Sequence, residues 1–345
     1  MCGAENCNLI AGQRRDLNRT QGTHGSGSQL LQVFGFDGAT IEQLLPGLLG
    51  TAGSQQVEGY LVGFGDVQVL QDDGSRLLAE SDDARQALLA SLLELCQAND
   101  IPSLHILFAS PLDLQACEHA GLLQRGQVQF HWQNQGWRDF DDFLSSLTQE
   151  KRKKIRQERR KVQEAGVTFR AVRGPDMSEA DWALLLRCYQ QTYWEHGNAP
   201  YLTPAFFEAM RTDMAQHWLL FVAERAGLPM GISLIGLHLG AQGQVEVAYG
   251  RYWGALARVD CLHFEACYYQ PIEWCITQGV QRFEGGAQGE HKMARALLPT
   301  PTHSAHWLAN PSFSEAVARF LEREKAGVDN YLDALHQHSP LKKPP

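Results

Sequence analysis

The sequence has no run of 18 apolar residues, so it predicts no membrane-spanning helix. Its start has no basic segment followed by an apolar core, which argues against a secretory signal. The eight cysteines have no close paired spacing, which argues against a disulfide framework. Neither an HExxH nor a CxxC spacing occurs, so no metal is expected. Together these absences predict a cytoplasmic protein in a reducing compartment.

Lysine and tryptophan are missing from the beginning of the chain. All eight lysines lie at or after Lys151, and all eight tryptophans lie between Trp132 and Trp307. The first 75 residues contain 14 glycines and one tyrosine. Such a segment buries little aromatic area and costs extra conformational entropy to order. We therefore predict that residues 1–75 are poorly structured or atypical.

One strongly basic segment stands against an acidic background. The chain carries a net charge of −9, which argues against general coating of nucleic acid. Residues 151–161 nevertheless read KRKKIRQERRK, and arginines three or four apart lie on neighbouring faces of one helix. Guanidinium groups suit bidentate binding of phosphate or carboxylate, so the segment predicts a site for an anionic ligand. The alternative is a solvated charged face.

From residue 81 onward, apolar spacing and turn residues predict alternating helices and strands. Helices are expected over residues 81–100, 112–120, 140–165, 178–196, 203–215, 260–278 and 312–326, with a kink at Pro271 in the sixth. Strands are expected over residues 103–108, 127–132, 167–172, 218–223, 230–235, 244–249, 281–284 and 303–307.

A glycine-rich segment near the C-terminus carries two carboxylates and an imidazole. Residues 283–292 read FEGGAQGEHK, and Glu284 ends a predicted strand. The glycines allow a ligand to approach the backbone closely. Glu290 or His291 could then deprotonate an attacking amine. The alternative is a tight turn whose polar residues cap neighbouring elements.

Three further histidines are candidates for a chemical role. His263 lies in a predicted helix, where a buried, hydrogen-bonded imidazole is the more common role. His303 and His306 fall in one strand at an odd separation, so they face opposite sides and do not hold one metal together. No cysteine lies beside an obvious base in the sequence, so a covalent acyl-cysteine is not expected.

Nine separate segments resemble one protein family. They lie at residues 130–132 (FHW), 140–144 (FDDFL), 151–159 (KRKKIRQER), 196–197 (HG), 201–202 (YL), 250–254 (GRYWG), 262–270 (LHFEACYYQ), 286–292 (GAQGEHK) and 304–307 (SAHW). Over residues 77–335 the chain resembles the Fem-type, peptidoglycan biosynthesis/recognition-like family of predicted N-acyltransferases in the GNAT superfamily.

The resemblance implies a mixed α/β (α+β) fold, a GNAT-like core with a mostly antiparallel central sheet. Residues 76–135 would be the remnant of an incomplete first lobe, residues 136–335 the acyltransferase domain, and residues 336–345 a flexible tail. Two departures stand out. The first 75 residues do not look like a complete first lobe, and residues 252–260 contain only one glycine where GNAT proteins have a glycine-bearing pyrophosphate loop.

The resemblance also implies transfer of an acyl group from a small-molecule thioester or ester donor, expected to be acyl-CoA, to an amine. Catalytic roles are expected for Glu290, His291, Glu284 and Tyr252, the last as an acid for the departing thiolate unless it only packs. Donor or substrate binding is expected from Lys151, Arg152, Arg156, Arg159, Arg251, His263, Gln288 and Lys292. The alternatives are an aminoacyl-tRNA-dependent transferase, which the net acidity disfavours, and a non-catalytic binding module for an anionic envelope component. The oligomeric state stays open.

Overall fold

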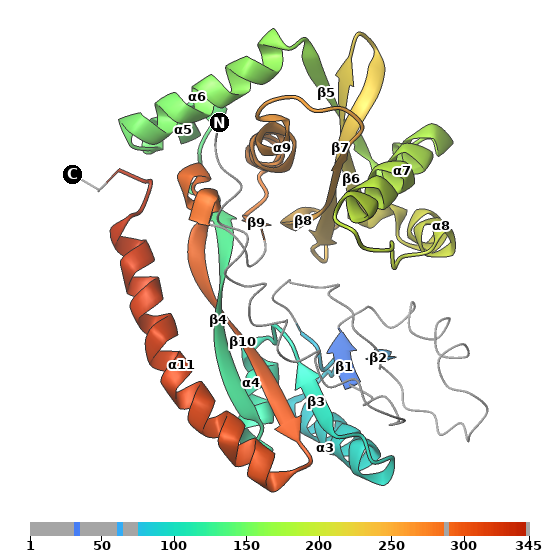
Figure 1. Cartoon of the computed structure of the whole chain (residues 1–345), viewed down its shortest axis with the longest axis vertical. Coiled ribbons are helices and arrows are strands. Elements are labelled where there is room, and N and C mark those ends of the chain that lie inside the picture. The colour runs from blue at the N-terminus through green and yellow to red at the C-terminus, as the bar shows by residue number, and fades with distance from the viewer. Residues whose placement is uncertain (1–30, 35–60, 65–74, 286–289, 343–345) are drawn as a thin grey trace.

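We describe the fold from a computed structural model, in which residues 31–34, 61–64, 75–285 and 290–342 are described (Figure 1). Most of the predicted atypical segment 1–75 lies outside these residues. The helices are α3 (Asp82–Ala98), α4 (Pro111–His119), α5 (Phe140–Ser146), α6 (Gln149–Glu164), α7 (Glu179–Glu195), α8 (Pro204–Asp213), α9 (Leu262–Phe264), α10 (Gln270–Gln278) and α11 (Pro311–Gln337). Short 3₁₀ turns are η1 (Gly174–Asp176), η2 (Ala215–His217) and η4 (Glu290–Arg295), and η3 (Glu265–Tyr269) is a π-helical turn.

The described strands form one sheet. They are β1 (Leu31–Phe34), β2 (Leu61–Phe64), β3 (Ser103–Ile106), β4 (Leu123–Gln133), β5 (Val167–Arg173), β6 (Trp218–Arg225), β7 (Leu228–Leu239), β8 (Val245–Ala255), β9 (Arg282–Glu284) and β10 (Leu298–Leu308). Their order is β2-β1-β3-β10-β4-β9-β8-β7-β6-β5. Among the described strands, only the β1–β3 and β8–β9 pairs are parallel. The predicted mixed α/β fold with a mostly antiparallel sheet is confirmed.

The helices cover the sheet in separate groups because strand side chains alternate between its faces. In β6, Leu220 and Val222 pack with α7 and α8. On the opposite face, Leu219 and Phe221 join the main core with α5, η3 and α10. At the other end of the sheet, β3 and β10 pack against α3 and α4. Each group thus has its own hydrophobic core, and β4, β9 and β10 connect them.

The predicted long helix over residues 140–165 is wrong, because two helices occupy that range. Leu147 has an extended backbone and is fully buried, and it forms a β-bridge with Leu341. The Thr148 N–H then donates to the Pro340 carbonyl at 2.9 Å. These contacts with residues 340 and 341 take the place of helical hydrogen bonds at Leu147 and Thr148. A second helix, α6, therefore begins at Gln149.

The predicted kink at Pro271 takes a different form. A π-helical turn, η3, precedes the proline, and Pro271 lies in the first turn of α10. Proline has no N–H to donate to a carbonyl four residues earlier, and a wider turn tolerates that loss. A separate strained position precedes α9, because Cys261 has a left-handed backbone (φ 66°).

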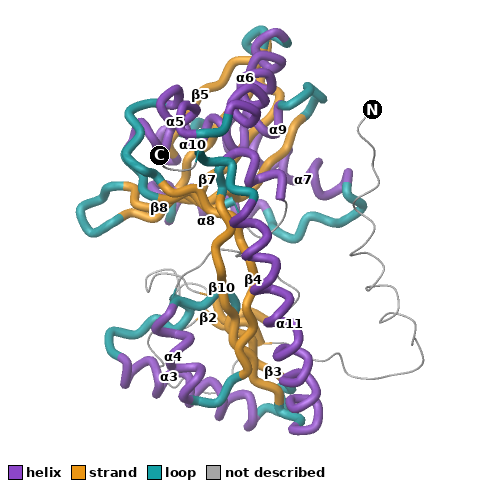
Figure 2. Tube along the Cα trace, turned by 90° about the vertical axis from the view of Figure 1, so that its left-hand side faces the viewer, coloured by secondary structure: helices purple, strands orange, loops and turns teal. Residues whose placement is uncertain are grey.

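The last helix is longer than its predicted range of 312–326. α11 runs along β4 and β10 over much of the molecule's length (Figures 1 and 2). The Asn310 side chain caps its start by accepting from the Phe313 N–H at 3.0 Å. Arg125 of β4 binds Glu324 of α11 with two hydrogen bonds of 2.7 and 2.8 Å. These contacts hold α11 against β4 and β10.

Helix α7 packs directly on β8 at Gly254, where an added methyl group would lie 2.5 Å from the Cys188 carbonyl oxygen. We expect Gly254→Ala to lower the free energy of unfolding by about 1–3 kcal/mol, as overpacking does. Gly126→Ala is the matched control, since its nearest neighbour would be His303 at 4.0 Å. Urea denaturation measures both, and equal effects would contradict the close packing.

Candidate functional site

The sheet divides at β9, which joins its two halves through three residues. His131 of β4 pairs with Glu284 of β9, and Tyr249 of β8 pairs with the same glutamate from the other side. Beyond Glu284, β4 and β8 diverge (Figure 1). The Gly285 N–H donates to the Phe130 carbonyl at 3.0 Å, which fixes the chain at this fork.

Lys292 of η4 lies at the fork and is only 7% exposed. Its ammonium group donates a hydrogen bond to the Gly285 carbonyl. Electrostatic interactions with His131 of β4 and Cys267 of η3 place the amine between these elements. Burial lowers the pKa of Lys292 to about 8, so a neutral amine is accessible near physiological pH.

A polar stripe crosses the sheet beside Lys292. Gln129, His131 and Glu284 are each at most 2% exposed, and they lie opposite Phe130, Trp132 and Phe283 of the main core because strand side chains alternate.

Within this stripe the buried Glu284 has two basic neighbours. Its carboxylate pairs with Arg282 at 2.8 Å and lies 3.8 Å from His131 Nε2. His131 Nε2 is also 3.0 Å from the Gln129 amide oxygen. Burial, together with the positive charges of Arg282 and Lys292, lowers the pKa of His131 to about 4. The imidazole is therefore neutral at pH 7.

His291 lies on the other side of Lys292 and is exposed. Its Nε2 is 3.2 Å from the Tyr268 hydroxyl, and its backbone carbonyl accepts from Arg295 at 2.7 Å. Partial burial of the ring lowers its pKa, as do the charges of Arg295, Lys292 and Lys154. His291 is thus a neutral, oriented imidazole at the surface.

A buried ion pair holds η4 against α6. Arg295 is 2% exposed and pairs with Glu158 at 2.8 Å. Its guanidinium carbon lies 3.6 Å from the centre of the Phe264 ring. The Tyr269 hydroxyl donates to the same Glu158 carboxylate. This pair connects three distant parts of the chain and fixes both His291 and Lys292.

The predicted ligand-binding cations of α6 are only partly available to a ligand. Arg159 pairs with Glu265 at 3.1 Å and with Glu273 at 2.6 Å. Arg156 pairs with Asp141 and Lys151 with Glu150. Arg152 is half-buried near the helix start. The exposed lysines Lys154 and Lys161 instead interact electrostatically with His291 of η4 and with Cys261, which precedes α9.

Tyr252 belongs to a cluster of tyrosines above α7. Its hydroxyl is 3.3 Å from that of Tyr201, and its ring lies 5.1 Å from Tyr189. Burial raises the pKa of Tyr252 to about 12. The neighbouring Arg251 lies 5.5 Å from the Tyr249 ring centre, and burial lowers its pKa to about 10. Tyr252 therefore packs in an aromatic cluster, while Arg251 turns toward the fork.

Cys267 of η3 interacts electrostatically with Lys292. The Ser233 hydroxyl hydrogen-bonds its thiol, yet burial raises the pKa of Cys267 to about 12. A thiol with this pKa is protonated at pH 7 and is a weak nucleophile. The structure thus brings a cysteine and an amine together, which sequence spacing does not predict, but it gives no activated thiolate.

The structure brings three of the residues that the sequence predicts for the site, Glu284, His291 and Lys292, to one place. Gln288 and the side chain of Glu290 lie outside the described residues. The sequence did not indicate His131 or Tyr268 as partners of the site. The alternation of 127–132 puts His131 on the face opposite Phe130 and Trp132, which is the one signal that pointed to it.

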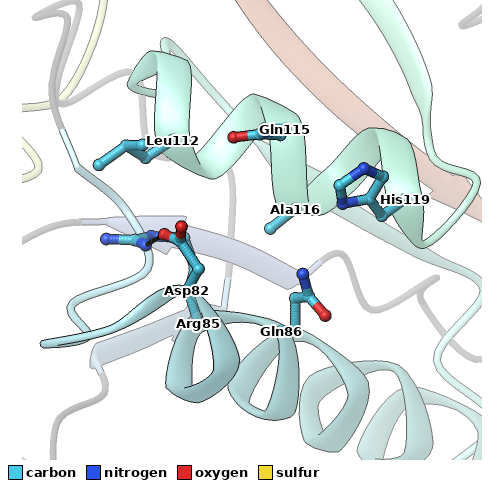
Figure 3. Close-up of a pocket in the computed structure, with 7 residues that line it drawn as sticks. All are labelled: Asp82, Arg85, Gln86, Leu112, Gln115, Ala116 and His119. Carbon is cyan, nitrogen blue, oxygen red and sulfur yellow. Dashed lines mark hydrogen bonds and ion pairs between the residues drawn. The ribbon is translucent and has the colours of Figure 1, made fainter.

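Outside this region, the described residues show little that suggests chemistry. A surface cleft of about 80 Å³ separates α3 from α4 (Figure 3), and its Arg85 is already paired with Asp82 and Asp113. The residues that line it are Asp82, Arg85, Gln86, Leu112, Gln115, Ala116 and His119. In the described part of the chain, no group of three metal-ligating side chains comes together, and no helix has the length and apolar character to cross a bilayer.

Comparison with known proteins gives one family and several similar folds. A family described as FemAB-like, peptidoglycan biosynthesis/recognition, matches residues 71–343. No curated protein matches the sequence. The C-terminal domain of a putative lysylphosphatidylglycerol synthetase from Agrobacterium fabrum has a TM-score of 0.50 and 12% identity, covering 70% of this chain and 78% of that chain.

Two further solved structures are similar. FemX has a TM-score of 0.48 and 11% identity, covering 78% of this chain and 89% of its own. A tandem GNAT protein from the clavulanic acid biosynthesis pathway has a TM-score of 0.40 and 13% identity, covering 74% and 82%.

Proposed function

Because this chain belongs to the FemAB-like family of peptidoglycan biosynthesis/recognition proteins, we propose that it is an N-acyltransferase. It would move an acyl or aminoacyl group from a thioester or ester donor to an amine. The observation that carries this proposal is the buried Lys292 at the fork between β4 and β8, with a pKa lowered to about 8. A general base works best when its pKa lies near the working pH.

In this mechanism an acceptor that arrives as an ammonium first loses one proton to solvent, and the neutral Lys292 amine takes a second proton from the resulting amine as it attacks. The acceptor nitrogen then bonds to the donor carbonyl carbon, and the C–S or C–O bond of the donor breaks. The leaving thiolate or alkoxide receives the proton that Lys292 has taken up. The hydrogen bond to the Gly285 carbonyl orients the Lys292 amine for this role.

The surroundings of Lys292 suit a polar reaction. His131, neutral because burial and neighbouring cations lower its pKa to about 4, adds no charge that would disfavour an approaching ammonium. Glu284 and Arg282 are already paired, so the polar stripe beside the fork offers hydrogen bonds without an isolated buried charge. Acyl-CoA is the proposed donor. Aminoacyl-tRNA is the alternative, which the exposed cations of α6 favour.

The test is a transfer assay with labelled acetyl-CoA and labelled aminoacyl-tRNA against primary amines, amino sugars and lysine-containing peptides. With an active pair, we expect kcat to rise with pH through an apparent pKa near 8, because only the neutral Lys292 amine accepts a proton. A kcat that falls as pH passes 8 would contradict a base. No transfer with any pair would favour a non-catalytic binding module.

A further inference from the structure

Four aromatic rings from three distant segments meet on the surface beside Lys292. They are Trp253 of β8, His263 and Phe264 of α9, and His291 of η4. Ring centres are 5.4 Å apart for Trp253–His263, 5.6 Å for His263–Phe264 and 6.2 Å for Phe264–His291. All four side chains are partly or largely exposed. We call this set the aromatic surface.

The rings of the aromatic surface are held firmly from beneath. Arg295 stacks under Phe264, and the buried Tyr268 hydroxyl hydrogen-bonds His291. Burial, with the neighbouring positive charges, lowers the pKa of His263 to about 4 and also lowers that of His291. Both imidazoles are therefore neutral, flat rings at pH 7, which suits stacking against another ring.

Two lysines of α6 border the aromatic surface. Lys154 and Lys161 are seven residues apart, so they project from the same side of the helix. Glu158 lies between them and binds Arg295, which turns this side of α6 toward η4. Lys154 interacts electrostatically with His291, and Lys161 with Cys261, which precedes α9. Both lysines are exposed.

Aromatic rings next to lysines suit a nucleotide, because bases stack on aromatic side chains while phosphates pair with cations. We propose that the aromatic surface, with Lys154 and Lys161, binds a purine nucleotide end of the acyl donor. The base stacks on His291 and His263, and the phosphates contact the two lysines. This inference rests on the proposed function, since coenzyme A and the 3′ end of tRNA share a phosphorylated adenosine.

The test uses adenosine 3′,5′-bisphosphate in a calorimetric titration of the full chain, because this probe carries no acyl group. We expect saturable binding that His291→Ala weakens about 5- to 100-fold, as loss of one stacked base does. Lys154→Ala should weaken binding and reduce its salt dependence. Lys153→Ala is the matched control, since Lys153 is exposed but projects about 100° away around α6.

Coenzyme A and a short RNA ending in CCA are titrated in parallel, and the tighter of the two identifies the donor. Absence of bisphosphate binding, or equal losses for Lys153→Ala and Lys154→Ala, would overturn the nucleotide site. Bisphosphate binding without any transfer would leave the site standing and reject the proposed function. Transfer from a donor whose KM is unchanged by His291→Ala would support the proposed function and reject the nucleotide site.

Discussion

Replacing Lys292 with methionine should lower kcat by about 10²- to 10⁴-fold, the usual contribution of a general base. Methionine has a similar length and is apolar, so it fills the buried site at the fork between β4 and β8. The lost hydrogen bond leaves the Gly285 carbonyl without this donor, which costs about 1–3 kcal/mol of stability. Steady-state transfer kinetics measure the effect, and a thermal unfolding curve verifies that the variant is folded.

Lys292→Arg separates a proton acceptor from a simple positive charge. Arginine stays protonated at every accessible pH, so it supplies charge but takes up no proton. We expect this variant to be as inactive as Lys292→Met. An arginine variant with most of the original kcat would show that Lys292 acts through its charge, and the base mechanism would fail.

Replacing Arg295 with methionine should lower the free energy of unfolding by about 3–5 kcal/mol. Removing one partner of a buried ion pair leaves the other charge without compensation. Here Glu158, 8% exposed, would keep only the Tyr269 hydroxyl as a described partner. Urea denaturation followed by tryptophan fluorescence measures the loss. Because Arg295 also fixes the His291 carbonyl, activity should fall in the folded fraction as well.

Two companion variants test the physical reason for this loss. The double variant Glu158→Leu with Arg295→Met removes both charges, and it should recover most of the lost stability. Arg156→Met removes an exposed ion pair with Asp141, which is worth about 0–1 kcal/mol. If Arg295→Met costs no more than Arg156→Met, the pair is not a stabilising connection between η4 and α6.

The sequence predicted regular elements well where the signal is local. Ser178 and Asp181 form the capping box that starts α7, and that helix was expected within one residue of its observed start. The break at Leu147 was not predictable, because it depends on Leu341, almost 200 residues away. The π-helical turn before Pro271 likewise needs the packing of η3 against β6 and β7.

The candidate site shows the same division between local and long-range information. Glu284, His291 and Lys292 lie within nine residues, so a glycine-rich polar motif revealed them together. The charges of α6 were also visible, but their partners were not. Glu265 and Glu273 occupy Arg159 across the fold, and Arg295 occupies Glu158. Only tertiary structure shows that Lys154 and Lys161 are the cations that border the site.

The position of β10 has a consequence for synthesis on the ribosome. β3 and β4 do not pair with each other, because β10 lies between them and pairs with both. A nascent chain that ends before residue 298 therefore exposes the inner edges of both strands, and such edges invite pairing with other chains. The first half of the molecule completes its sheet only after residue 308 has left the exit tunnel, so chaperone protection matters most during that interval.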